Sequence, residues 1–185
     1  MSAVFQLFGF PGTGKLTIGR EIVRQLVAAD RPATLLDNHS TSNLVWSLVT
    51  PDRRFDEEVM AHMAKVRAAL LTAAEALAEP ERSFVFTNFL PAGRDRHVAD
   101  GHRDLALRMG RRFVAVALTC DRDDVLARVE SPERAANMKV ADRGLATMIM
   151  DAGQTLPTHW PELTELDITG LTPEESAARV IALAD

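Results

Sequence analysis

The sequence contains a single cysteine, Cys120, among its 185 residues. One cysteine excludes an internal disulfide and any zinc site built from several cysteines. No apolar run approaches the roughly 20 residues that a membrane-spanning helix needs, and the amino terminus lacks a basic segment followed by a long apolar one. We therefore expect a cytoplasmic protein without a membrane partner.

Positive charge is also in short supply. The 21 Lys and Arg residues face 26 Asp and Glu residues, which gives a formal net charge of −5. This balance argues against a broad nucleic-acid surface, although a local basic cluster for a small phosphorylated ligand is compatible with it. Repeats, low-complexity tracts and linkers are absent as well, so we predict one domain over residues 1–185, long enough for a substantial core.

The most informative stretch runs from Val4 to Arg20, where a short apolar strand, a glycine-rich turn and an amphipathic helix follow one another. Gly9, four residues, Gly14 and Lys15 fit the pattern of a phosphate-binding loop. Residues without a Cβ atom let consecutive N–H groups face an anion, and the positive end of the following helix faces the same anion. Lys15 would add a mobile charge for the β and γ phosphates.

One position departs from the general pattern. A Ser or Thr directly after the lysine usually reaches Mg²⁺, whereas here Leu16 stands there and Thr17 follows. Adenylate kinases carry Gly-x-Pro-Gly-x-Gly-Lys-x-Thr, and the sequence resembles them at this motif. The resemblance implies that the protein uses ATP as cofactor and that Thr17 binds Mg²⁺ directly or through water. The alternative is that the motif is an ordinary glycine-rich turn between a strand and a helix. The predicted nucleotide-binding residues in the loop are Gly9, Pro11, Gly12, Thr13, Gly14, Lys15, Leu16 and Thr17.

A second polar signal follows the apolar strand expected over residues 33–36. The chain changes abruptly there to Asp37, Asn38, His39 and Ser40. Ligands gather outside the carboxyl ends of strands in open α/β sheets, so Asp37 is predicted to take the proton from an acceptor hydroxyl. His39 is the other candidate base. Alternatively, Asp37, Asn38 or Ser40 only caps a helix expected over 42–49.

Residues 38–79 are predicted to form a helical segment that binds the acceptor. Apolar residues recur every three or four positions from 55 to 79 and predict a long helix there. His62 and Arg67 lie at the margin of its apolar face, where they either reach the acceptor or are simply solvated. The strand expected over 83–88 ends in Asn88. Proteins with a phosphate-binding loop commonly have a metal-binding Asp at this place, so an Asn there favours a hydrogen-bonding role over direct Mg²⁺ ligation.

A third signal lies after the strand expected over 112–119 and the helix expected over 121–130. Basic residues concentrate in residues 130–147, which Pro132 interrupts. This pattern resembles that of nucleotide kinases, in which an arginine-bearing lid follows the fourth strand. The resemblance implies that Arg128 contacts the nucleotide and Arg134 the transferred phosphoryl group, where a positioned guanidinium is worth about 10³–10⁵ in rate. The alternative is a solvated loop whose basic residues pair with neighbouring acids.

The order of elements predicts the fold class. Five strands separated by helices must run parallel, so we predict an α/β protein: a three-layer α/β/α sandwich with a five-stranded parallel sheet, the P-loop nucleoside-triphosphate hydrolase fold. Further helices are expected over 14–28, 96–109 and 146–152 and after 173, with the fifth strand over 163–168. By resemblance to related kinases, the loop Thr169–Pro173 lines the base pocket.

The sequence as a whole resembles the adenylate-kinase-like phosphotransferases, which include shikimate kinases and chloramphenicol phosphotransferase. We therefore expect an ATP-dependent kinase of a small hydroxyl-bearing molecule, a metabolite, nucleotide or antibiotic, with Lys15, Asp37 and Arg134 as its catalytic residues. The chain lacks the Gly-Gly-Gly run of shikimate kinases and the Asp-Gly of many adenylate kinases after the third strand, which leaves the acceptor open. The alternatives are a P-loop ATPase or regulatory nucleotide-binding module, and a binding protein that keeps the loop for structure alone.

Overall fold

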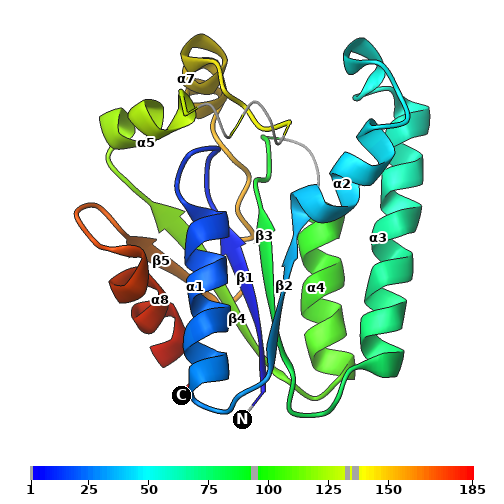
Figure 1. Ribbon diagram of the computed structural model, residues 1–185, viewed down its shortest axis with the longest axis vertical. Helices are drawn as coiled ribbons and strands as arrows, with labels where there is room; N and C mark the ends of the chain where they lie inside the picture. Colours follow the sequence, from blue (N-terminus) through cyan, green and yellow to red (C-terminus); the bar gives the residue numbers. More distant parts are fainter. Residues whose placement is uncertain (1, 93–95, 132–133, 135–137) are drawn as a thin grey trace.

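The computed structural model describes residues 2–92, 96–131, 134 and 138–185 (Figure 1). Its centre is a sheet of five strands in the order β2-β3-β1-β4-β5, and every neighbouring pair is parallel. This arrangement confirms the predicted fold class. The strands are β1 (Ala3–Phe8), β2 (Ala33–Asp37), β3 (Ser83–Asn88), β4 (Arg112–Thr119) and β5 (Leu163–Asp167).

The central strands could be identified in the sequence because both of their faces are covered. Every residue of β1 and β3 is buried, and such strands appear in a sequence as continuous apolar runs rather than as alternating ones. Parallel neighbours also require a crossover between them, which the helices supply. The edge strands β2 and β5 are only partly buried.

The helices are close to those predicted, with one exception. The helix expected over 42–49 is instead α2 (Asn38–Trp46), which follows β2 without a loop. Its first turn is polar and gives no helical periodicity, so the sequence placed its start too late. The other helical elements are α1 (Lys15–Ala28), η1 (Pro51–Arg53), α3 (Glu57–Leu77), α4 (Arg96–Arg108), α5 (Arg122–Val129), α7 (Arg143–Ala152) and α8 (Pro173–Ala182).

Two cores lie on the two faces of the sheet, because alternate side chains of a strand point to opposite faces. Helices α1 and α8 cover one face, where Phe5 and Leu7 of β1 pack with Ile22. Helix α4, with part of α3, covers the other, where Phe8 packs with residues that include Leu105. Full burial of one such side chain stabilises the fold by about 1.5–3 kcal/mol.

The carboxyl ends of β1, β2 and β3 meet at one edge of the sheet, the upper edge in Figure 1. The register pairs Phe8 with Asn88 and Asp37 with Thr87, so the loop after β1 and the polar residues after β2 begin at the same edge, with the end of β3 between them. Helix α2 and helices α5 and α7 stand on either side above this edge (Figure 1). Within the described ranges, no helix is both long enough and apolar enough to span a membrane.

Candidate active site

The phosphate-binding loop connects β1 to α1 and is held together by its own residues. Gly12 and Gly14 have φ values of 99° and 89°, which residues with a Cβ atom rarely adopt. The buried Thr13 donates a hydrogen bond from Oγ1 to the carbonyl of Phe10 at 3.0 Å. Lys15 Nζ donates to the carbonyls of Gly9 and Phe10 at 2.7 and 2.8 Å. The lysine therefore folds back over the loop and places its charge there.

Helix α5 supports the loop from one side. A Cβ atom on Gly12 would lie 2.9 Å from Val125 Cγ1, from the Val125 carbonyl oxygen and from Val129 Cγ2. Real Cβ contacts are essentially never this short, so only glycine fits between the loop and this helix. The glycine at position 12 is therefore required by packing as well as by its backbone conformation.

The charge of Lys15 is coupled to groups from distant parts of the chain. Its pKa is lowered to about 7, chiefly by burial and also by the positive charges of Arg134 and Lys139, with Asp37 acting in the opposite direction. Coulombic effects weaken as the distance between two charges grows, so these groups must lie near one another. The structure therefore brings Lys15, Asp37 and Arg134 together at one edge of the sheet.

Asp37 is held by the neighbouring strand. One of its carboxylate oxygens, Oδ1, accepts a hydrogen bond from the hydroxyl of Thr87, which is buried at the end of β3. Asp37 occupies the position that precedes α2, yet its side chain makes no capping hydrogen bond. The cap interpretation of this side chain is therefore wrong for the observed helix.

The other residue considered as a base, His39, is the second residue of α2. Its Nδ1 lies 3.3 Å from Oδ1 of Asn43. Burial lowers the pKa of His39, and the charges of Lys139 and Lys15 push in the same direction, whereas Asp37 opposes them. Since both Asp37 and His39 face the same basic groups, the choice between them as base stays a prediction.

The two arginines predicted to bind phosphates differ in their surroundings. Arg134 is half-buried, and its Nε donates to the Val140 carbonyl at 2.8 Å, so its guanidinium is anchored. Burial lowers its pKa. Arg128 is exposed on α5 and forms an ion pair of 3.7 Å with Asp124. The solvated alternative thus describes Arg128 better than Arg134, and the nucleotide contact of Arg128 stays a prediction.

The predicted lid, residues 130–147, is described only in part. Residues 132–133 and 135–137 lie outside the described residues. Arg143, at the start of α7, pairs with Glu130 at 3.6 Å across this segment. Lys139, which the charge pattern contains but the sequence did not single out, is half-buried, and its pKa is lowered by burial and raised by Asp37. It is therefore a further cation of the site.

Thr17 and Leu16 follow the lysine on the first turn of α1, and Thr17 is exposed. In the part of the chain that the structure describes, no group of three or more His, Cys, Asp and Glu residues could hold a metal ion. Mg²⁺ commonly keeps several waters and binds through substrate phosphates with few protein ligands. A Mg²⁺ ion carried by the nucleotide would fit this donor set, with the Thr17 hydroxyl as the predicted ligand.

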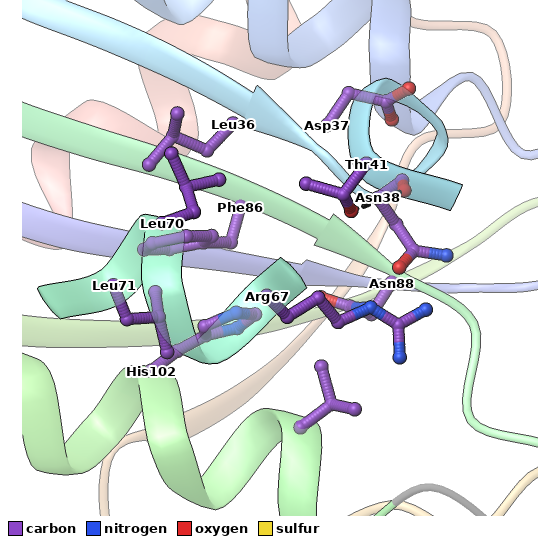
Figure 2. Close-up of a pocket in the computed structure, with 11 residues that line it drawn as sticks. Leu36, Asp37, Asn38, Thr41, Arg67, Leu70, Leu71, Phe86, Asn88 and His102 are labelled. Carbon is purple, nitrogen blue, oxygen red and sulfur yellow. Dashed lines mark hydrogen bonds between the residues drawn. The ribbon is translucent and has the colours of Figure 1, made fainter. Parts of the chain in front are cut away.

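A small pocket opens beside Asp37; the space between its lining residues is about 300 Å³, a figure that includes the open solvent at its mouth. Figure 2 shows side chains from β2, β3 and helices α2, α3 and α4 around it. Its apolar wall contains Leu36, Leu70, Leu71, Phe86 and Val98. Its polar groups are Asp37, Asn38, Thr41, Arg67, Asn88 and His102.

The structure decides between the two interpretations of Arg67, which was expected either to reach the acceptor or to be solvated. The solvated interpretation is wrong for this side chain, because it is half-buried, lines the pocket and donates from Nη2 to the buried Ser42 hydroxyl at 3.2 Å. His62, by contrast, is exposed, and its Nδ1 lies 3.0 Å from the Glu58 carbonyl oxygen. His102 of α4 also lines the pocket, and the sequence did not identify it as a site residue.

A second, shallower hollow lies at the ends of β4 and β5. Thr169 Oγ1 donates to Asp167 at 2.7 Å and accepts from the Asp121 backbone at 2.9 Å. Asp121 also caps α5 through its side chain. The hollow contains part of the loop expected to line the base pocket, and that role stays a prediction.

The strand order and the loop after β1 define the fold: the chain has the P-loop NTPase fold, which solved structures of kinases share. The Mycobacterium tuberculosis APS kinase in complex with AMPPNP and APS aligns with a TM-score of 0.66 at 19% identity, covering 98% of this chain and 96% of that one. A putative kinase from Chloroflexus aurantiacus gives 0.66 at 16% identity, covering 100% and 99%. The tunicamycin resistance protein of Deinococcus radiodurans gives 0.61 at 16%, covering 98% and 95%.

The sequence itself gives no closer relationship. No protein-family model matches it, and no curated protein sequence matches it. At these identities the structural likeness shows the fold, and the chemistry must be argued from the residues of this chain.

Proposed function

We propose that the protein is an ATP-dependent kinase that transfers the γ-phosphoryl group of ATP to the hydroxyl of a small molecule. The observation that carries this proposal is the electrostatic coupling of Lys15 to Asp37 and Arg134 beside the pocket. A cationic phosphate site next to a carboxylate is what phosphoryl transfer to a hydroxyl requires. Neighbours that are an APS kinase, a sugar kinase and a thymidylate kinase support phosphotransfer without selecting an acceptor.

The phosphate end of the reaction would use the loop and the basic groups. Backbone N–H groups of residues 9–15 and the amino end of α1 would bind the polyphosphate. Lys15 would exchange its two carbonyl partners for phosphate oxygens, and Arg134, with Lys139 beside it, would neutralise charge on the transferred group. Mg²⁺, when bound, would neutralise further phosphate charge.

The acceptor end would use Asp37. The Thr87 hydroxyl bonds to Oδ1 and so fixes the carboxylate, which leaves Oδ2 to accept the proton of the attacking hydroxyl. The apolar wall of the pocket would hold the body of the acceptor and keep water from the phosphoryl group. Proximity of this kind supplies much of the rate in phosphoryl transfer.

A screen of metabolites and antibiotics for ATP consumption tests the proposal. We expect ATP turnover that depends on one acceptor class and disappears in Lys15→Ala, which also loses nucleotide binding. Unchanged nucleotide affinity in Lys15→Ala would refute the assignment of the loop.

Asn88 favours the alternative of an ATPase or regulatory nucleotide-binding module, because it stands where a metal-binding Asp is common and provides no charge. Phosphate release at the same rate with and without every acceptor would support that alternative. The same assay therefore separates the two functions.

A further inference from the structure

A buried chain of polar side chains runs from β1 to the pocket, where two of its members, Asn88 and His102, form part of the lining. Gln6 of β1 is fully buried, and Asn88 and His102 are 5% and 6% exposed. Together with Phe86, Asn88 and His102 form what we call the pocket floor. Buried polar groups are costly unless each finds a partner, so the hydrogen bonds among these three residues fix which atom donates and which accepts.

The orientation of the Gln6 amide follows from one contact. Its Nε2 lies 3.3 Å from the backbone carbonyl of Leu7, which can only accept a hydrogen bond. The nitrogen must therefore be on that side, where it also donates to Oδ1 of Asn88 at 3.1 Å. Oε1 of Gln6 consequently faces the other way, toward His102.

The tautomer of His102 follows in turn. Its Nδ1 lies 2.6 Å from Oε1 of Gln6, which has no proton to give, so Nδ1 carries the proton. In a neutral imidazole, Nε2 is then an unprotonated acceptor. Among the described residues, this nitrogen has no hydrogen-bond partner. Burial and the charge of Arg67 lower the pKa of His102 to about 3, which keeps the ring neutral.

The floor therefore presents a fixed hydrogen-bonding pattern. Oδ1 of Asn88 accepts the hydrogen bond from Gln6 Nε2, which leaves the Nδ2 group of Asn88 as a donor. The ring of His102 is held in place by stacking on Phe86, with centroids 3.8 Å apart and planes within 12°. Figure 2 shows His102 from α4 and Arg67 from α3 among the residues around the pocket.

We propose that the acceptor molecule donates a hydrogen bond from an O–H or N–H group to Nε2 of His102, and that Gln6 is the positioning residue that keeps this nitrogen an acceptor. The inference rests on the proposed function in taking this pocket as the acceptor site. It defines the substrate class as a hydroxylated molecule with an apolar portion and a second donor group besides the hydroxyl that is phosphorylated. Arg67 disfavours an ammonium as that second donor, because like charges would meet at the floor.

Binding of phenol and anisole to the full chain tests the proposal without any nucleotide. Both probes are apolar rings with one oxygen that can accept a hydrogen bond, but only phenol can donate one to His102. We expect phenol to bind about tenfold more tightly than anisole, because anisole leaves a buried acceptor unpaired. In ¹⁵N spectra of histidine-labelled protein, phenol should shift the Nε2 signal of His102, and this signal should be that of an unprotonated nitrogen.

Two variants isolate the hydrogen bond. His102→Phe keeps a ring against Phe86 but has no acceptor, so the preference for phenol over anisole should disappear while anisole still binds. Gln6→Glu places a carboxylate beside His102 and should raise its pKa by about one to three units. Since a protonated ring donates from Nε2, the phenol preference of Gln6→Glu should fall as the pH is lowered through that pKa, whereas the natural chain keeps its preference.

The proposal is overturned if Nε2 of His102 carries the proton in the natural chain, or if phenol fails to bind at its highest soluble concentration. Equal binding of phenol and anisole, or a phenol preference that survives His102→Phe, would overturn it as well. Because none of these measurements uses ATP, a failure of the kinase assignment shows separately, as loss of acceptor-dependent ATP turnover.

Discussion

At the scale of single residues, Lys15 links nucleotide binding to pH. Its pKa is lowered to about 7 by burial and by Arg134 and Lys139, and a bound polyphosphate would raise it again. Binding should therefore take up a proton above pH 7 and none below it. We expect the contribution of Lys15 to the ADP affinity to be constant below about pH 7 and to fall by up to tenfold per pH unit above it.

Calorimetric titration with ADP between about pH 7.5 and 9.5 measures this slope, because phosphate groups with a second pKa near 6 are already ionised there. Lys15→Arg is the matched control. Its guanidinium stays charged throughout, so its affinity should not change with pH over the same range. A flat profile in the natural chain would show that Lys15 is already fully protonated in the free protein.

Asp37→Asn gives the second residue-scale prediction. The amide cannot take the acceptor proton, so turnover should fall by about 10²–10⁴ while nucleotide affinity is kept or slightly improved, since a negative charge near the phosphates is removed. Thr87→Val nearly preserves the shape of the side chain but removes the hydroxyl that donates to Oδ1 of Asp37. This variant should cause a smaller loss of turnover. Steady-state rates and ADP titrations measure both effects, and undiminished turnover in Asp37→Asn would exclude this residue as the base.

At the scale of elements, the fit between the phosphate-binding loop and α5 allows a stability prediction. In Gly12→Ala the new methyl group would meet Val125 and Val129 at 2.9 Å, with a φ of 99°. Backbone strain of about 1–2 kcal/mol and overpacking of about 1–3 kcal/mol should add to a loss of about 2–5 kcal/mol. Urea unfolding of the variant and the natural chain measures this loss.

Gly14→Ala separates strain from packing. Gly14 has a similar φ of 89°, but a Cβ atom there would find its nearest neighbour, Ile18 Cδ1, at 3.9 Å. The free energy of unfolding of Gly14→Ala should therefore fall only by the backbone strain, about 1–2 kcal/mol. Equal losses in the two variants would show that α5 does not restrict the loop.

The elements also explain how far the sequence could lead. Strands β1 and β3 could be found because their burial on both faces leaves continuous apolar runs, and the loop could be found because its glycines are local in the chain. The start of α2 was misplaced, since a polar first turn carries no periodicity. Lys139 stayed unassigned because its link to Lys15 is a contact between distant segments.

The hydrogen bond from Gln6 to Asn88 and the contact of Gln6 with His102 connect residues 82 and 96 positions apart. A glutamine in an otherwise apolar strand is the one sign of such a network in the sequence. Its partners, and the orientation of each amide, became known only once β1, β3 and α4 had been placed together.

At the scale of the whole molecule, the shared sheet argues that the chain unfolds as one unit. The cores on both faces use side chains of β1, so loss of one exposes the strand that supports the other. Helices α2 and α3 are joined by a smaller cluster of Val45, Val59 and Met63, which makes them the segment most able to open by itself. The single domain over 1–185 stays a prediction, which is tested by whether α2 and α3 unfold together with the rest of the chain.

The two tryptophans report on these regions separately. Trp160 packs on Phe8 and Phe113 in the core under α4, whereas Trp46 of α2 donates to the Arg54 carbonyl at 3.0 Å. We expect Trp46→Phe and Trp160→Phe, each with one remaining tryptophan, to show fluorescence transitions in urea that coincide with the loss of helical circular dichroism. ADP at about 100 times its Kd should stabilise both signals by about 2.7 kcal/mol, because it binds only the folded chain. An earlier transition of Trp46 would instead identify α2 and α3 as a separate cooperative unit, and nucleotide would then shift only the later, Trp160 transition.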